Sequence, residues 1–194
     1  MKVCGLTGGV GMGKSTATEF LRARRVPVVD TDELARQLVQ PGQAALVEIQ
    51  NAFGNDILAA DGRLQREKLA RIVFADAVAR RKLEAILHPP IRERWQAQVE
   101  TWRGENHPLA VAVIPLLFET GAEPAFDRII CVACSAAAQR ERLLARGWTP
   151  DQIRHRLAAQ WPIDQKIARS DFVVWTDGTP DIHARQLEQI LAGL

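Results

Sequence analysis

Residues 8–15 read GGVGMGKS and fit the pattern G-x-x-x-x-G-K-[ST]. This glycine-rich segment follows a short apolar run at residues 3–6 and opens a helical pattern over residues 14–24. Glycines allow backbone N–H groups to wrap around a phosphate, and the first turn of the helix adds the positive end of its dipole. The chain is therefore predicted to bind a nucleoside triphosphate, with Lys14 on the phosphates and Ser15 as a ligand of Mg²⁺.

The composition is that of a globular protein of one domain with room for an inserted subdomain. The 194 residues carry 25 basic and 23 acidic side chains, and this net charge of +2 argues against a nucleic-acid partner. No apolar run approaches the ~18 residues of a membrane span, so no membrane association is expected. Three cysteines cannot all pair, which is typical of a cytoplasmic protein. The oligomeric state has no signature in the sequence.

Strand and helix signals alternate at both ends of the chain but not in its middle. The strands predicted from short apolar runs are residues 3–6, 26–29, 109–117, 128–134 and 171–175. Such continuous runs are typical of strands buried on both faces, as in parallel sheets. The helices expected around them are residues 14–24, 136–146, 151–160 and the chain from about Pro180. One long helix is expected from about Asp76 to Trp102, bent or interrupted near Pro89 and Pro90.

These patterns predict an α/β protein with the three-layer fold of P-loop nucleoside triphosphatases. It would have a five-stranded parallel sheet, a helical acceptor-binding insertion and a lid. The nucleotide-binding core is expected to comprise residues 1–31, 104–138 and 171–194. The acceptor domain would be residues 32–103, where strand signals are almost absent, and the lid would be residues 139–170.

An arginine-rich segment supports the prediction of a lid. Between Gln139 and Arg169, seven basic residues stand against three acidic ones. Arg142 and Arg146 share one helix face, and forked guanidinium donors suit the charge on a transferring phosphoryl group. The alternatives are a solvated helix face or an RNA-binding patch, although only two aromatic residues lie nearby.

Acidic side chains follow two of the predicted strands. Asp30 and Asp32 come after the second strand, at the edge of the sheet where open α/β proteins bind ligands. Either carboxylate can accept the proton of an attacking hydroxyl group, hold Mg²⁺ through water, or simply cap the next helix. Glu119 closes the long apolar run and is expected near Mg²⁺ or the acceptor, or as a helix cap.

Two other patterns admit a functional and a structural interpretation. Cys131 and Cys134 have no second C-x-x-C pair, and their odd spacing on a strand directs them to opposite faces, so core cysteines are expected. His88 lies before Pro89 in the helical region, where a lone histidine is more often structural than functional.

The nucleotide motif fits a small kinase better than a switch GTPase. No Asp is followed by Gly three residues later and no Asn is followed by Lys, so both GTPase motifs are missing. Two rivals remain: a kinase for another small acceptor, and a non-catalytic module that changes shape when it binds ATP. The candidate base and the arginine segment favour catalysis over the second rival.

Several motifs together resemble the bacterial dephospho-coenzyme A kinase family, and the resemblance covers nearly the whole chain. They are LTGGVGMGKS at 6–15, VDTD at 29–32 with Ala35 and Arg36, LHP at 87–89 with Ile91 and Arg92, and PLLFE at 115–119. The lid helix of the family is similar at Gln139, Arg142, Leu143 and Arg146, and the segment after it at Arg156, Gln160 and Lys166. Many kinases share the P-loop, whereas the LHP and PLLFE motifs are far more specific.

The resemblance implies that ATP, with Mg²⁺, phosphorylates the ribose 3′-hydroxyl of dephospho-CoA, the last step of coenzyme A biosynthesis. Asp32 would be the general base, and the charge-stabilising catalytic residues would be Lys14, Arg142 and Arg146. The ATP-binding residues would be Thr7, Gly8, Gly11, Met12, Gly13, Lys14, Ser15 and Thr16, with Ser15 on the metal. The acceptor would contact Asp32, Arg36, His88, Arg92 and Glu119. Thr176 stands where the family is expected to have Asn, in a loop expected to border the adenine.

Overall fold

A computed structural model describes all 194 residues of the chain, which form two compact units. The first unit comprises residues 1–30 and 99–194, and the second comprises residues 31–98. The segment predicted as a lid, residues 139–170, belongs to the first unit. The finer division into core, acceptor domain and lid stays a prediction.

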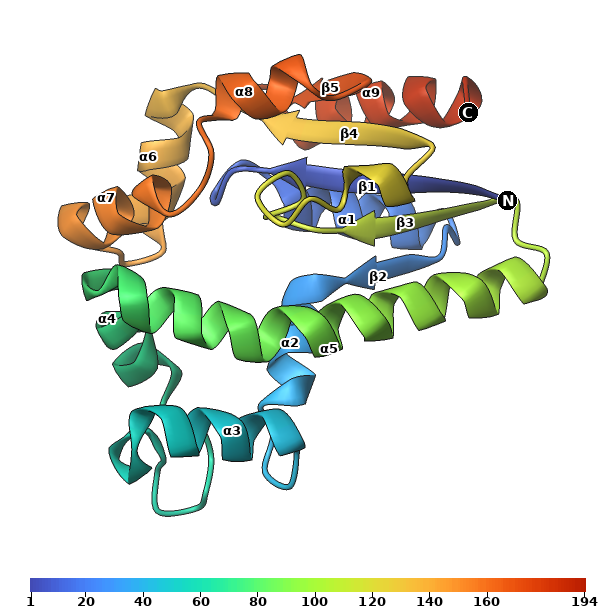
Figure 1. Cartoon of the computed structure of the whole chain (residues 1–194). Helices are drawn as coiled ribbons and strands as arrows, with labels where there is room; N and C mark the ends of the chain where they lie inside the picture. Colours follow the sequence, from blue (N-terminus) through green and yellow to red (C-terminus); the bar gives the residue numbers. More distant parts are fainter. The chain divides into compact units, whose positions relative to one another are not determined.

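The elements alternate between strands and helices at both ends of the chain, and no strand of the sheet lies between β2 and β3 (Figure 1). In order they are β1 (Lys2–Gly8), α1 (Lys14–Ala23), β2 (Val28–Asp30), α2 (Thr31–Leu38), α3 (Ala44–Phe53), η1 (Asn55–Ile57), α4 (Arg66–Ala75), α5 (Ala77–Gly104), β3 (Leu109–Val113), η2 (Glu123–Ala125), β4 (Arg128–Ala133), α6 (Ala136–Ala145), α7 (Pro150–Ala158), α8 (Ile163–Ala168), β5 (Phe172–Trp175) and α9 (Pro180–Ala192).

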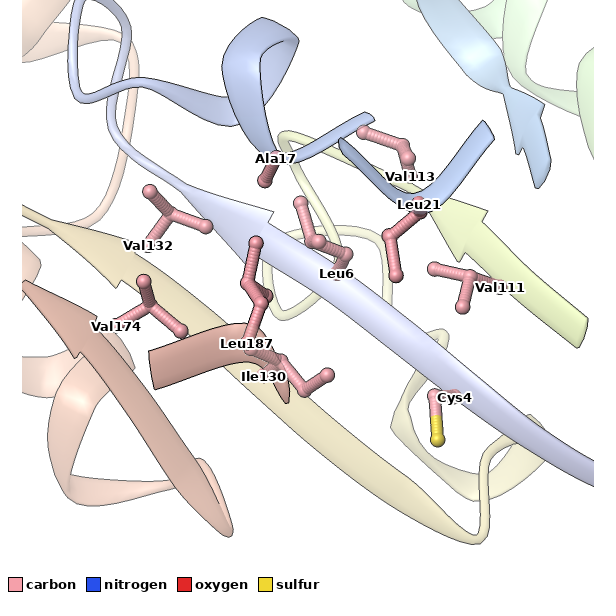
Figure 2. Close-up of a cluster of buried hydrophobic side chains, with 10 residues drawn as sticks. All are labelled: Cys4, Leu6, Ala17, Leu21, Val111, Val113, Ile130, Val132, Val174 and Leu187. Carbon is pink, nitrogen blue, oxygen red and sulfur yellow. The ribbon is translucent and has the colours of Figure 1, made fainter. Parts of the chain in front are cut away.

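The five strands form one parallel sheet in the order β2-β3-β1-β4-β5, which confirms the predicted sheet. One face is covered by α1 and α9, whose apolar residues meet alternate side chains of the strands (Figure 2). The fully or almost fully buried side chains of this cluster are Cys4, Leu6, Ala17, Leu21, Val111, Val113, Ile130, Val132, Val174 and Leu187. Because side chains alternate along a strand, Gly5 points to the opposite face, where Leu117 and Phe126 approach it closely.

The strand order creates a switch point between β1 and β4, which are neighbours in the sheet. The chain leaves β1 through α1 toward β2 on one side, whereas it leaves β4 toward β5 on the other side. Open α/β sheets bind ligands in the crevice that such diverging connections leave at the carboxyl ends of the strands. Residues 8–15, the P-loop, begin at this point.

Two predicted elements differ from the structure. The apolar run of residues 109–117 was expected to be one strand, but β3 ends at Val113 and Pro115 lies outside the strand. Burial alone does not make a strand, and a proline cannot donate to a sheet ladder. The helix expected to be bent or interrupted near Pro89 and Pro90 is not interrupted there, and continues over 28 residues as α5.

The second unit has a small apolar core of its own, built by α3, η1 and α4 with one face of α5. Its buried members are Val39, Leu46, Ile49, Ile57, Leu69 and Val73. This unit carries Asp32, Arg36, His88 and Arg92, four of the five residues predicted to contact the acceptor.

No helix of the chain has the length and apolar character needed to span a bilayer.

Candidate active site

The P-loop holds its lysine against its own backbone. Nζ of Lys14 donates hydrogen bonds to the carbonyl oxygens of Gly8 at 2.8 Å and Gly9 at 2.9 Å. These bonds fold the side chain back over the loop, so the ammonium lies beside the backbone that the sequence predicts to receive phosphates. Lys14 itself is half-buried, which strengthens its attraction for an anion relative to a fully solvated ammonium.

Two glycines let the loop press against its neighbours. Gly8 has a φ of 146°, and a Cβ atom there would lie 2.2 Å from the carbonyl oxygen of Val132 on β4. Gly11 has a φ of 77°, and a Cβ atom there would lie 2.9 Å from side-chain carbons of Leu143 on α6. The glycines thus serve close packing of the loop on β4 and α6 as well as its left-handed backbone turns.

The remaining loop residues predicted to bind ATP divide into buried and exposed groups. Thr7 is fully buried and its hydroxyl donates to the carbonyl oxygen of Pro115 at 3.2 Å. Met12 is also buried. Ser15 and Thr16, in the first turn of α1, are exposed, so both residues are accessible to a ligand from solvent.

Arg142 is joined to the P-loop through Thr176. Its Nη1 donates to Oγ1 of Thr176 at 2.9 Å, and its Nη2 donates to the carbonyl oxygen of the same residue. Oγ1 of Thr176 in turn donates to the carbonyl oxygen of Met12 at 3.0 Å. The loop after β5 therefore connects α6 with the P-loop, while Arg146, one helical turn beyond Arg142, is exposed.

Glu119 belongs to a buried ion pair. Its Oε1 lies 2.8 Å from Nζ of Lys166 and accepts the backbone N–H of Trp161 at 2.8 Å. Lys166 is completely buried and also donates to the carbonyl oxygen of Pro115 at 2.7 Å. Oε2 of Glu119 is buried without a hydrogen-bond partner, and so keeps an acceptor available. A helix cap, one of the two interpretations of Glu119, is not what this side chain does.

The second unit carries the other four predicted residues in two helix segments. Asp32 is exposed in the first turn of α2, and the carbonyl oxygen of this residue accepts Nε of Arg36 at 3.1 Å. His88 and Arg92 lie one turn apart on α5 and therefore share a helix face. Burial of His88 lowers the pKa of its imidazole below 6.5, and Arg92 lowers it further while Glu84 opposes the shift.

The cysteines have no role in this site. Cys131 and Cys134 are free and buried, as expected, and so is Cys4. Burial raises the pKa of the Cys131 thiol to about 11 and that of the Cys4 thiol to about 11, so both remain protonated.

Three further side chains contact the site, although the chemistry of the motifs did not identify them as functional. Lys166 is one of the seven basic residues of the arginine-rich segment, yet it has no exposed surface. Gln139 and Gln160 both bind the backbone of Val10 in the P-loop. The available signal was positional: all three stand in the segments similar to the lid region of the kinase family.

The first unit thus gathers the P-loop, Arg142 and Glu119 at the carboxyl edge of the sheet. The second unit presents Asp32 beside Arg36, and His88 beside Arg92. A loop able to cradle phosphates, with a lysine, an arginine and exposed hydroxyl groups, is suited to phosphoryl transfer from a nucleoside triphosphate.

Comparison with known proteins agrees with this chemistry. The sequence model of the dephospho-CoA kinase family matches residues 2–181. A dephospho-CoA kinase from Anaeromyxobacter dehalogenans is 47% identical over 195 residues, which cover 100% of this chain and 92% of that protein. A crystal structure from Thermus thermophilus is similar with a TM-score of 0.82 at 32% identity, covering 100% of this chain and 97% of that one. The structure of dephospho-CoA kinase from Campylobacter jejuni has the same fold, with a TM-score of 0.69 at 23% identity over 98% and 95% of the two chains.

Proposed function

The chain belongs to the dephospho-CoA kinase family, whose members carry out the last step of coenzyme A biosynthesis, and we propose which of its residues perform that reaction. In it, the γ-phosphoryl group of ATP passes to the ribose 3′-hydroxyl of dephospho-CoA. The P-loop binds the ATP phosphates, Asp32 acts on the hydroxyl group, and two arginines of α6 and its C-terminal end stabilise the transferring group.

Asp32 orients the ribose hydroxyl and accepts its proton as the oxygen attacks phosphorus. Its exposed position in the first turn of α2 leaves the carboxylate accessible to a substrate. A base contributes to this reaction mainly by holding the nucleophile in line, because little proton transfer is complete in a loose phosphoryl-transfer transition state. The proton leaves the ribose oxygen for Asp32, while the bond between the γ-phosphorus and the bridging oxygen of ATP breaks and releases ADP.

Lys14, Arg142 and Arg146 stabilise the negative charge that spreads over the transferring phosphoryl oxygens. Lys14 can exchange its two backbone acceptors, on Gly8 and Gly9, for phosphate oxygens without a large movement. Arg142 is held by Thr176 beside the P-loop, and Arg146 extends from the end of α6. Preorganised donors of this kind supply most of the rate enhancement in such sites.

Ser15 suits a Mg²⁺ ion that ATP brings with it. Its hydroxyl is exposed in the first turn of α1, and the chain holds no cluster of three or more His, Cys, Asp or Glu side chains that could form a metal cage. Mg²⁺ is commonly held in this way, by one or two protein oxygens together with substrate phosphates. When bound, the ion neutralises phosphate charge, and Ser15 would hold it.

Arg36, His88 and Arg92 of the second unit, together with Glu119, contact dephospho-CoA. The two arginines carry positive charge toward an acceptor that is rich in phosphate. His88, with its lowered pKa, is neutral at neutral pH and can donate one hydrogen bond or accept one. Oε2 of Glu119, buried and unpartnered, can accept a hydrogen bond from the acceptor. The protein acts in the cytoplasm in this proposal, in keeping with its three free cysteines.

The observation that carries the proposal is the P-loop with Lys14 folded over it, at the switch point of a chain that matches the kinase family along its length. The test measures ADP release with ATP and Mg²⁺ in the presence of dephospho-CoA, AMP, CMP, shikimate or gluconate. Release with dephospho-CoA alone, and a product heavier by one phosphate, is the expected result. Release with another acceptor would overturn the acceptor assignment, and ATP binding without any release would overturn the assignment as a kinase.

A further inference from the structure

We propose that Gln139 and Gln160 clamp the tip of the P-loop and position its backbone for ATP, so that both ends of the arginine-bearing segment act on one residue, Val10. Nε2 of Gln139 donates to the carbonyl oxygen of Val10 at 2.7 Å, and Oε1 of Gln160 accepts the N–H of Val10 at 3.0 Å. The inference rests on the proposed function, because it assigns positioning residues to the same ATP site.

The two bonds fix two consecutive peptide planes. The N–H of Val10 belongs to the peptide that joins it to Gly9, and its carbonyl belongs to the peptide that joins it to Gly11. In a trans peptide the N–H points opposite to the carbonyl oxygen. Gln139 therefore aims the N–H of Gly11 away from α6, and Gly11 is one of the residues expected to bind ATP phosphates. The hydrogen bond from the N–H of Met12 to the carbonyl oxygen of Gly9, at 3.3 Å, already closes this turn. The bond from Gln139 adds to the restraint on Gly11, whose φ is 77°.

The Gln139 end of the clamp is part of a packed helix. Gln139 is 7% exposed, and Leu143, one turn along α6, is fully buried against Gly11. A Cβ atom at Gly9 would lie 3.2 Å from Nε2 of Gln139, so the amide group closely covers the loop. The position of this end is therefore set by the packing of α6 on the loop.

The Gln160 end is anchored through its neighbour Trp161. The Trp161 ring stacks on Phe118 with centroids 6.1 Å apart and planes 9° apart. The Trp161 N–H donates to Glu119, which is paired with the buried Lys166. Gln160 therefore reaches the P-loop from a backbone position that Trp161 holds against Phe118 and Glu119, in the loop after β3.

The clamp couples the exposed part of the lid to the phosphate site. Between Gln139 and Gln160 lie the C-terminal half of α6, Arg146 and the whole of α7, which is largely exposed. A movement of this segment lengthens or breaks the hydrogen bonds to the N–H or the carbonyl oxygen of Val10, and so changes the orientation of the loop amides. Arginine closure and phosphate binding are linked in this way through two uncharged side chains.

The test replaces each glutamine by methionine, which keeps the length of the side chain but cannot make either hydrogen bond. Binding of ATP and Mg²⁺ is measured by calorimetry without dephospho-CoA. Gln160→Met and Gln139→Met are each expected to weaken ATP binding about tenfold, as loss of one well-placed hydrogen bond would do. The matched control is Gln152→Met: Gln152 belongs to the same segment, but its side chain caps its own helix with Thr149.

A second readout does not involve ATP. Hydrogen exchange at the Val10 amide, followed by NMR in the nucleotide-free protein, should accelerate about tenfold in Gln160→Met because the amide loses its acceptor. It should be unchanged in Gln152→Met. Gln160 is only half-buried, so this variant tests the clamp even where Gln139→Met fails to fold.

Wild-type affinity for ATP in both glutamine variants, or equal losses in Gln152→Met, would overturn the clamp. An unchanged exchange rate of the Val10 amide in Gln160→Met would overturn it too. Failure of the proposed function has a different signature: wild-type protein that binds ATP and phosphorylates no dephospho-CoA. That result leaves both readouts of the clamp intact.

Discussion

The ammonium nitrogen of Lys166, a residue without exposed surface, lies 2.8 Å from Oε1 of Glu119. The pair joins α8 to the loop after β3, and through Pro115 it reaches Thr7 at the end of β1. A buried charge that loses its partner cannot be solvated without unfolding, so the two side chains depend on each other.

Lys166→Met should lower the free energy of unfolding by about 3–5 kcal/mol, because it leaves the Glu119 carboxylate buried and unpaired. Urea unfolding monitored by circular dichroism measures the loss. The double variant Lys166→Met, Glu119→Leu should recover a large part of it, since both charges are then absent. A double variant as unstable as the sum of the two single variants would refute the coupling.

Lys14→Ala should lower turnover by at least ~100-fold, because the transferring phosphoryl group loses a preorganised positive charge. The fold should be retained, since Lys14 is half-buried and its amine donates to the loop's own carbonyl oxygens at Gly8 and Gly9. Steady-state ADP release measures the effect, and a thermal melt serves as the control for folding. Near-normal turnover would remove Lys14 from the assigned role.

Asp32→Asn should also lower turnover by at least ~100-fold, because a neutral amide holds the attacking hydroxyl group less firmly than a carboxylate and cannot take up its proton. The side chain is exposed and keeps its size, so the fold should be retained. Calorimetry with ATP separates the effects, since ATP affinity should remain that of the wild type. Asp30→Asn is the matched comparison: a larger loss there than in Asp32→Asn would move the base to Asp30.

The free energy of unfolding should fall as the pH drops below 6.5, partly because of His183. Burial lowers the pKa of this imidazole below its usual value of 6.5, and Arg142 adds to the shift. The imidazole therefore binds a proton more readily in the unfolded chain than in the folded one. The contribution of neutral His183 to the free energy of unfolding is fully present above pH 6.5 and is lost as the pH falls. Burial of His88 lowers the pKa of that imidazole and acts in the same direction.

His183→Leu should therefore lose less stability than the wild type between about pH 7.5 and about pH 5.5 in urea unfolding experiments. His155→Leu, at an exposed position of α7, provides the comparison and should keep the full acid sensitivity. Identical pH dependence in wild type and His183→Leu would exclude His183 as a source of the effect.

The sequence predicted those elements of the fold whose pattern lies within a short stretch of residues. The P-loop, the helix from Lys14 and the five parallel strands all follow from glycine spacing and short apolar runs. The end of β3 did not follow, because residues 114–117 are apolar for a different reason: they pack on the sheet from a loop. The prolines at 89 and 90 were expected to disturb a helix that tolerates them.

The candidate site was predictable in its chemistry but not in its supporting contacts. Lys14 and Arg142 could be identified from the sequence, because both are charged residues within recognisable motifs. Gln139 and Gln160 do not, because an uncharged amide has no signature and its partner, Val10, is more than a hundred residues away in sequence. The burial of Lys166 was not predicted either, since the sequence does not show that Glu119 lies beside it as an ion-pair partner.

The burial of all three cysteines allows the predicted lid, residues 139–170, to be labelled selectively for spectroscopy. Their thiols are enclosed and, for Cys4 and Cys131, protonated at neutral pH, so maleimide reagents would react slowly with the native chain. A cysteine introduced at an exposed lid position such as Arg154, and another at Glu188 on α9, would then be the preferred points of attachment. A pair of fluorophores there could report how far α7 travels when ATP arrives, without removal of any native residue from the core.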